Sequence, residues 1–266
     1  MNRSLALAAA CWVVGVVAGV VAERVAIGYG AIVGSVTAVS IGVFLAHRWK
    51  GGLAAEAQLA SRKATQAEAM AVLAPPTDRP FLPWSDWALA PDVILHIIGF
   101  LRVRDWSTVV ECGSGISTVL FAQEFRARGK GHVYALEHDA DWAVLVRAML
   151  AERGLSEWAT VVTAPLEPME SDGMRFQWYA AAPLASVQAL PKVDVLLVDG
   201  PKRATGPLAR YPALPAFVHQ LGQGYLVVLD DGHRPDETTI ASLWSQRYHM
   251  AFTLNPTVRG QWEAIT

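Results

Sequence analysis

The stretch VVECGSGIST, residues 109–118, combines an acidic residue with a glycine turn. An apolar run ends at Glu111, and Gly113 and Gly115 follow it closely. Turns of this kind after a strand cradle part of a nucleotide, because glycine lets the backbone approach the ligand. Thr118 stands where a dinucleotide fingerprint has its third glycine. The glycines alone therefore leave the kind of nucleotide open.

Glu111 favours one kind of ligand over another. A carboxylate at a strand tip repels a pyrophosphate across a low-dielectric site and attracts an ammonium. S-adenosylmethionine carries an α-amino group and a sulfonium in place of phosphates, so the sequence predicts it as the cofactor. Glu137 is placed to accept the ribose hydroxyls of either cofactor. The predicted cofactor-binding residues are Glu111, Gly113, Ser114, Gly115, Ser117, Thr118, Glu137, His138 and Asp199.

A second group of acids closes two later apolar runs. Asp199 ends VDVLLVD, and Asp230 and Asp231 end GYLVVLDD. Neighbouring strand ends lie about 5 Å apart, so three unpaired carboxylates there would repel one another. A divalent cation such as magnesium or manganese resolves the repulsion, because it prefers hard oxygen ligands. Alternatively, Asp199 contacts substrate or cofactor and Asp230 caps the following helix.

Strands and helices alternate around these residues. Both apolar runs are continuous rather than alternating, as in strands covered on both faces of a parallel sheet. "NPTVRG" is too short for a crossover helix, so the last two strands should pair antiparallel. The expected fold class is α/β: a doubly wound, Rossmann-like, seven-stranded and mostly parallel sheet with a C-terminal antiparallel hairpin, preceded by two transmembrane helices. The expected strands are 108–111, 132–137, 159–163, 193–199, 225–230, 249–254 and 261–265, with helices after the first five.

At these residues the chain resembles the class I S-adenosylmethionine-dependent methyltransferases, over about residues 80–266. The matching pieces are ECGSGIST, YALEHD, LLVDGP and VVLDDG. PWSDWALAPD, ATGPLARYPALP and DDGHRPDE resemble a bacterial O-methyltransferase-like branch. Cys112 departs from the pattern and is interpreted as a small buried hydrophobe. The resemblance implies methylation of a hydroxyl on an unknown small-molecule, glycan or lipid-linked acceptor.

The three acids are similar to the metal site of the catechol O-methyltransferases. In that family an Asp at the end of the fourth strand, and an Asp with an Asn or Asp at the fifth, hold magnesium. A lysine three residues beyond the first Asp acts there as the base, and Lys202 has that spacing. The resemblance implies Asp199, Asp230 and Asp231 as metal ligands, and Asp199, Lys202 and Asp231 as catalytic residues. The alternative for Lys202 is a solvated loop cation.

Two sets of flanking residues are candidates for contacts with the acceptor or the adenine. The first set lies in loops and would orient the acceptor or bind an anionic group, unless its members are surface residues: Arg203, Arg210, Tyr211, His233 and Arg234. The second set is aromatic: Trp84, Trp87, Trp178 and Tyr179. The chain has ten tryptophans, so most of them are expected to be packing residues.

The N-terminal residues are set apart by their hydropathy. Between Ser4 and Ala46 only Glu23 and Arg24 are charged, which predicts transmembrane helices at about 4–22 and 25–46. A cleaved signal peptide is the alternative for the first. Basic residues flank the outer ends, so we expect a multi-pass protein of a bacterial-type inner or plasma membrane with a cytoplasmic catalytic domain. Both stretches contain GxxxG, which allows a homodimer through the spans.

Composition bounds the rest of the chain. The expected domains are 1–50 as a membrane hairpin, 51–79 as an Ala-rich helical linker and 80–266 as the methyltransferase domain. Residues 1–50 hold four of the 22 Lys and Arg and one of the 24 Asp and Glu, so the remainder is mildly acidic. It shows no basic stripe with interleaved aromatics, which argues against nucleic acid as a partner. Two cysteines are too few for a disulfide framework or a zinc site.

Two other classes of function stay open at this point. A nicotinamide-dependent oxidoreductase uses a related sheet, but Glu111, the terminal hairpin and the lack of a Tyr-x-x-x-Lys pair count against it. A non-catalytic membrane assembly protein would keep the fold without the chemistry. The full set of acids at the strand ends counts against that second alternative.

Overall fold

The computed structural model describes residues 10, 12–17, 40, 58–73, 84–85, 87–257 and 259–266. The chain divides into two compact units, Met1–Ala64 and Thr65–Thr266. Residues 10, 12–17 and 40 of the first unit are helical, and so are residues 58–73, which belong to the predicted linker. The sheet and the candidate site lie in the second unit.

The predicted membrane location is corrected. Apart from residues 10, 12–17 and 40, the predicted spans at 4–22 and 25–46 lie outside the described residues. In the described part of the chain, no helix combines the length and the apolar character needed to cross a bilayer. The membrane anchor therefore has no support in the structure.

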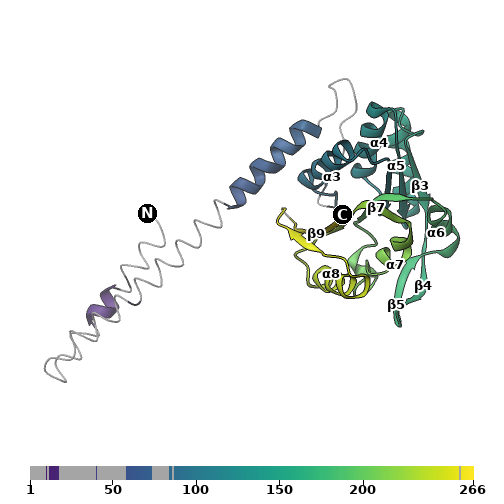
Figure 1. Ribbon diagram of the computed structural model, residues 1–266. Coiled ribbons are helices and arrows are strands. Elements are labelled where there is room, and N and C mark those ends of the chain that lie inside the picture. Colours follow the sequence, from purple (N-terminus) through teal and green to yellow (C-terminus); the bar gives the residue numbers. More distant parts are fainter. Residues whose placement is uncertain are drawn as a thin grey trace. The chain divides into compact units, whose positions relative to one another are not determined.

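A seven-stranded sheet forms the centre of the second unit (Figure 1). Its strand order is β3-β2-β1-β6-β7-β9-β8. The first five strands of this order pair in parallel, and β9 pairs antiparallel with both β7 and β8. The mostly parallel sheet with a C-terminal antiparallel hairpin is confirmed. The strand bounds are β1 Thr108–Cys112, β2 His132–Glu137, β3 Ala159–Thr163, β6 Val193–Val198, β7 Leu221–Asp230, β8 Thr253–Asn255 and β9 Gln261–Ile265.

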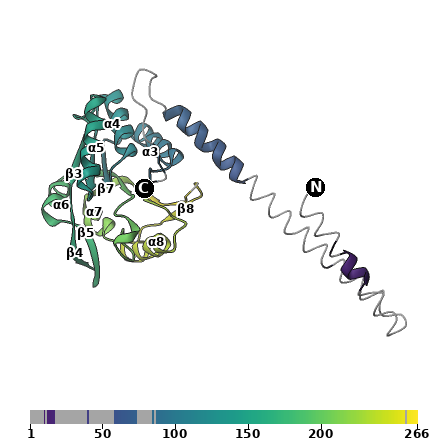
Figure 2. The same cartoon turned by 180° about the vertical axis from the view of Figure 1, so that it is seen from behind.

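Helices cover both faces of the sheet (Figure 2). Side chains alternate along a strand, so Val109 packs into one core, with α3, α4 and α5, and Val110 into the other, with α6, α7 and α8. α3 begins at Pro91, whose fixed φ suits a first helical turn. The helix bounds are α3 Pro91–Val103, α4 Ile116–Arg128, α5 Ala140–Glu152, α6 Ala181–Gln188, α7 Ala213–Phe217 and α8 Pro235–Tyr248.

A separate β-hairpin follows β3, where the sequence predicted a helix. It consists of β4 (Leu166–Ser171) and β5 (Met174–Tyr179), and α6 comes only after it. Asp172 and Gly173 form the turn with φ of 54° and 75°, as a two-residue hairpin requires. The strand predicted at 249–254 is shorter, because His249 ends α8 in the left-handed conformation and β8 begins at Thr253.

Candidate active site

The predicted site residues collect at one edge of the sheet. Glu137 and Asp230 are the last residues of β2 and β7, and Asp199 directly follows β6. The glycine turn follows β1 at the same edge. Ligands of open α/β sheets bind beyond the carboxyl ends of the strands, so this edge is the candidate active site.

The glycine turn is fixed by its neighbours. Gly113 has a φ of 99°, and its N–H donates to the Leu136 carbonyl at 2.9 Å. Gly200, which the sequence analysis did not single out, closes the turn from the end of β6. A Cβ on Gly200 would lie 3.0 Å from the Tyr179 hydroxyl, 3.1 Å from the Cys112 carbonyl oxygen and 3.1 Å from the Gly113 nitrogen. Only glycine allows the ends of β1 and β6 to approach so closely.

Glu111 lies behind the turn and is buried. Its Oε2 accepts the Thr118 hydroxyl at 2.5 Å, and that hydroxyl accepts the Gly115 N–H at 3.0 Å. Ser117 and Thr118 are buried in the first turn of α4. Oε1 of Glu111 has no hydrogen-bond partner among the described residues. Burial raises the pKa of Glu111 to about 7, although the hydroxyls of Thr118 and Ser117 lower it.

Glu137 holds the glycine turn from the end of β2. Its Oε2 accepts the Ser114 N–H at 2.9 Å and the Ser114 hydroxyl at 3.0 Å, and its Oε1 accepts the Asp139 N–H at 2.9 Å. His138 Nδ1 lies 3.1 Å from Oε1. Burial alone raises the pKa of Glu137, but these donors outweigh burial and leave it below its ordinary value. Glu137 is therefore ionised at neutral pH.

Asp199, Asp230 and Asp231 converge as predicted. One carboxylate oxygen from each lies within 4.8 Å of the others. Both Asp230 carboxylate oxygens are buried and lack a hydrogen-bond partner in the part of the chain that is described. Burial and the charge of Asp231 raise the pKa of Asp230 to about 6. The Asp199 side chain is partly exposed, yet burial of its carboxyl and the charge of Asp230 raise its pKa well above the ordinary value.

Arg210 lies among these acids with only 4% of its surface exposed. Its Nη2 is 3.2 Å from Asp199 Oδ1 and 3.1 Å from Asp231 Oδ2. Nη2 also donates to the Asp199 carbonyl at 3.0 Å, and Nη1 to the Asp230 carbonyl at 3.1 Å. The sequence placed Arg210 at the acceptor or on the surface. The surface interpretation is wrong because the side chain is buried, and contact with an acceptor stays a prediction.

A family model described as a methyltransferase domain matches residues 110–232. No curated protein matches the chain. Solved structures match at low identity. An SAH-bound methyltransferase from Podospora anserina is 14% identical with a TM-score of 0.54, and the match covers 79% of this chain and 94% of that one. A putative caffeoyl-CoA O-methyltransferase from Staphylococcus aureus is 13% identical with a TM-score of 0.52, covering 82% and 98%.

An O-methyltransferase from Bacillus cereus in complex with SAH is 16% identical with a TM-score of 0.50, and the match covers 76% of this chain and 90% of that one. At such identities the likeness concerns the architecture. The domain has a class I methyltransferase fold.

Two predicted basic residues of this methyltransferase fold point away from the acids. Lys202 Nζ lies 3.8 Å from Asp139 Oδ2, beyond the end of β2, and is largely exposed. Arg203 Nε lies 3.7 Å from Asp236 Oδ2, also at the surface. The structure thus brings Lys202 to the Glu137 side of the edge, and its role as a base stays a prediction.

The residues after Asp231 take different positions. Arg234 Nη1 lies 2.6 Å from Asp231 Oδ2. His233 is exposed, and its N–H donates to the Arg259 carbonyl at 3.2 Å. Arg234 therefore belongs to the acid cluster, whereas the His233 ring is on the surface.

The four aromatic residues predicted to cover the adenine or the acceptor differ in burial. Trp178 and Tyr179 end β5 and pack in the core on the α6 face of the sheet. Trp84 packs partly against the other core, and Trp87 is 79% exposed. The burial of Trp178 and Tyr179 argues against them as an exposed cover for the adenine, whereas the assignment of Trp84 and Trp87 stays a prediction.

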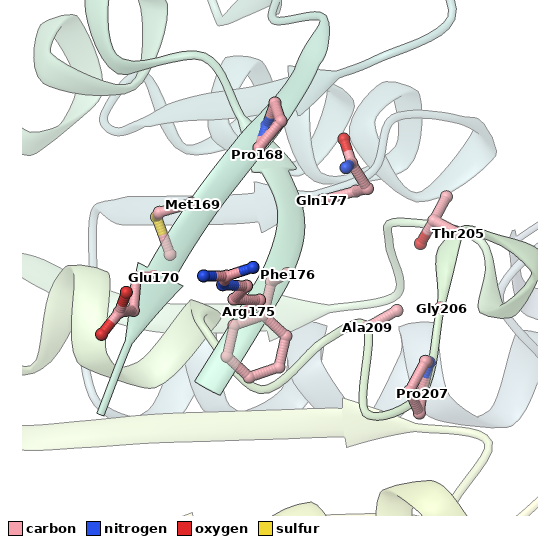
Figure 3. Close-up of a pocket in the computed structure, with 10 residues that line it drawn as sticks. All are labelled: Pro168, Met169, Glu170, Arg175, Phe176, Gln177, Thr205, Gly206, Pro207 and Ala209. Atoms are coloured by element: carbon pink, nitrogen blue, oxygen red, sulfur yellow. The ribbon is translucent and has the colours of Figure 1, made fainter. Parts of the chain in front are cut away.

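A cavity of about 380 Å³ lies between the β4–β5 hairpin and the loop at 205–209 (Figure 3). Met169, Phe176 and Pro207 give it apolar walls, and Glu170 and Arg175 bring charge to it. It includes no residue of the glycine turn. The cavity is therefore separate from the predicted cofactor residues, although the loop that lines it leads from Asp199 to Arg210.

Proposed function

We propose that the chain is an S-adenosylmethionine-dependent methyltransferase that methylates an oxygen of a hydroxyl acceptor. The observation that carries the proposal is the pair of carboxylates around one glycine turn: Glu111 behind it and Glu137 at the end of the next strand. The match to the methyltransferase-domain model and the fold shared with SAH-bound methyltransferases support it.

The residues around the turn fit this cofactor. Glu111 Oε1 is buried without a partner in the described structure, so its negative charge is left to act on a nearby cation. Glu137 is ionised and lies where ribose hydroxyls bind in such sheets. When bound, S-adenosylmethionine supplies a methyl group attached to a positively charged sulfur. The residues of the glycine turn would bind the cofactor and so orient its methyl group.

Asp199 is the proposed base. Methylation of a hydroxyl oxygen would form a carbon–oxygen bond and break the bond from the methyl carbon to the cofactor's sulfur, which keeps the electron pair and leaves as the neutral thioether. The hydroxyl proton must then pass to a base. Asp199 is the one acid of the cluster that reaches solvent, and its raised pKa makes its carboxylate a stronger proton acceptor than an ordinary Asp. Arg210 lies beside Asp199 and contacts both Asp199 and Asp231. Lys202 is the alternative base, and its position beside Asp139 counts against it.

A divalent metal at Asp199, Asp230 and Asp231 is the competing hypothesis. The oxygen spacing meets the requirement of such an ion. The charge environment does not suit a divalent ion, because the Arg210 guanidinium already contacts Asp199 and Asp231. The residues present therefore do not fit a metal, and the proposed reaction uses none.

The cavity between the hairpin and the 205–209 loop is proposed to hold the part of the acceptor that is remote from its reacting hydroxyl, because no residue of the glycine turn or of the acid cluster lines it. Its apolar walls and its two charged side chains suit an acceptor with an apolar body and a charged end. Replacing Arg175 or Glu170 by Ala should raise the KM for the acceptor and leave cofactor affinity unchanged. An unchanged KM in both variants would move the acceptor elsewhere.

Calorimetry tests the cofactor assignment. The full chain is titrated with S-adenosylmethionine, S-adenosylhomocysteine and NAD, and we expect binding of the first two only. Glu137→Gln should weaken that binding at least tenfold, whereas Glu152→Gln, on the exposed side of α5, should not change it. Tight binding of NAD alone would refute the proposal. Incubation of a lysate with methyl-labelled cofactor then identifies the acceptor.

A further inference from the structure

We propose that Arg210 is the permanent cation of the acid cluster: it takes the place that a divalent metal would fill and positions Asp199, so that the site works without a metal. The claim that Arg210 positions Asp199 as a base rests on the proposed function. The claim that Arg210 excludes a divalent metal is independent of the proposed function.

The surroundings of Arg210 match a guanidinium. Arginine carries five N–H donors in a rigid planar fork. Carbonyl oxygens from the ends of two strands face this fork: those of Asp199 at 3.0 Å and Asp230 at 3.1 Å, with the Pro201 oxygen at 3.5 Å from Nε. Carboxylates complete the shell on its remaining sides. One side chain therefore binds both the main chain and the carboxylates of Asp199 and Asp231 at the junction of β6 and β7.

Arg210 contacts more of these acids than any other cation of the described residues, and Arg259 also acts on the charges of Asp199 and Asp230. Asp199 and Asp231 contact its Nη2, and Glu237 Oε1 lies 3.8 Å from Nη1. Arg234 adds a second guanidinium to Asp231. A divalent ion within reach of the same oxygens would meet the positive charge of Arg210 at short range and in a low dielectric, where repulsion is strong. The guanidinium and the metal thus exclude each other.

The unpartnered carboxylate of Asp230 is the observation that most favours a metal over Arg210. The two carboxylate oxygens of Asp230 lack hydrogen-bond partners in the described residues, as expected of ligands that await an ion. Asp230 is fully buried, however, and Mg²⁺ usually keeps several of its waters. Arg210 Nη1 donates to the Asp230 carbonyl, so the guanidinium is held at the residue that would have to supply the buried ligand. Removal of Arg210 should open the space in which an ion reaches all three acids.

Manganese binding to the full chain tests the exclusion. Free Mn²⁺ is counted by its paramagnetic resonance signal during titration of the wild type, Arg210→Ala, Arg210→Lys and Asp230→Asn. We expect Arg210→Ala to bind Mn²⁺ at least tenfold more tightly than the wild type, and Arg210→Lys to resemble the wild type, because lysine keeps the charge. We expect Asp230→Asn to bind as weakly as the wild type.

One result overturns the proposal even if Arg210→Ala does not fold. Wild-type binding of Mn²⁺ in the micromolar range that falls tenfold or more in Asp230→Asn would show a metal at the cluster. Equal Mn²⁺ binding by folded Arg210→Ala and the wild type would also refute the exclusion. Neither readout depends on cofactor binding or on turnover, so failure here is distinct from failure of the proposed function.

Guanidinium rescue tests the positioning of Asp199. Millimolar guanidinium should raise the melting temperature of Arg210→Ala and restore part of its kcat, with no change in the KM for the cofactor. The matched control is Arg153→Ala, which removes another buried arginine that donates to the Met149 carbonyl, far from the acids. Its kcat should not respond. A kcat of Arg210→Ala equal to that of the wild type would refute the positioning role.

Discussion

The two halves of the candidate site neutralise their acids in different ways. On the cofactor side, Glu137 is surrounded by donors of the adjacent loops, and its pKa falls. On the proposed acceptor side, Arg210 contacts the carboxylates of Asp199 and Asp231, and the Asp230 carboxylate has no hydrogen-bond partner among the described residues. Burial raises the pKa values of Asp199 and Asp230. The His138 ring, main-chain N–H groups and a hydroxyl together are enough for one carboxylate at a turn. Several carboxylates brought together from two strand ends need a formal charge.

The largest expected effect comes from removing that charge. Arg210→Ala leaves buried acids unpaired, and loss of one partner from a buried ion pair costs about 3–5 kcal/mol. The free energy of unfolding from urea denaturation measures it. Arg153→Ala leaves no buried acid of this kind and should cost about 1–3 kcal/mol, as expected for lost hydrogen bonds. An equal loss of unfolding free energy in Arg210→Ala and Arg153→Ala would show that the acid cluster does not depend on the charge of Arg210.

The second effect is a pH dependence on the cofactor side. The pKa of Glu111 rises from 4.5 in the unfolded chain to about 7 in the fold. The folded state therefore holds the proton between these values, and the free energy of unfolding falls as pH rises from 4.5 to 7, by about 3 kcal/mol from this group. Glu111→Gln should remove that part of the slope. Parallel stability curves for the wild type and the variant would contradict the assignment.

The same titration should affect the cofactor. Binding of a cationic ligand favours ionised Glu111, so affinity for S-adenosylmethionine should fall as pH drops below 7, approaching tenfold per pH unit. Calorimetry between pH 5.5 and 8.5 measures this slope, and Glu111→Gln is expected to flatten it.

The third effect tests the contact between the two halves. Gly200→Ala places a Cβ within 3.1 Å of main-chain atoms of Cys112 and Gly113, which should cost about 1–3 kcal/mol through overpacking. Gly99→Ala is the control: no atom lies within 4 Å of the added Cβ, and alanine favours the helix by about 1 kcal/mol. Similar melting temperatures for Gly200→Ala and the wild type would mean that the strand ends can separate without cost.

The smallest effect is expected at the glycine turn. Ser114→Ala removes the hydroxyl that donates to Glu137 but keeps the N–H, so its cost should be about 1 kcal/mol. Urea denaturation beside Arg210→Ala gives the direct contrast. A loss as large as that of Arg210→Ala would show that the hydroxyl, rather than the main chain, holds the acid.

The two halves also differ in how far the sequence predicts them. The turn and the acids follow from local patterns, since a strand fixes where its last residue lies. Arg210 is eleven residues beyond Asp199 in an irregular crossover, so no periodicity marks its side chain as buried. Lys202 has a motif spacing, but its loop carries it to Asp139. The sequence analysis predicted a helix where the β4–β5 hairpin lies, although an Asp-Gly pair such as Asp172-Gly173 is typical of a two-residue hairpin turn.

Asp172, at the tip of the β4–β5 hairpin, contacts other elements through both of its carboxylate oxygens. Asp172 accepts the Tyr211 hydroxyl at 2.7 Å and forms an ion pair with Arg247 of α8. Tyr211 also stacks on Phe176 at 5.6 Å and directly follows Arg210. One dipeptide, 210–211, therefore serves both the acids and the wall of the cavity. For engineering, the transplantable module is the hairpin together with this dipeptide and Arg247, because a grafted hairpin alone would lose its anchor.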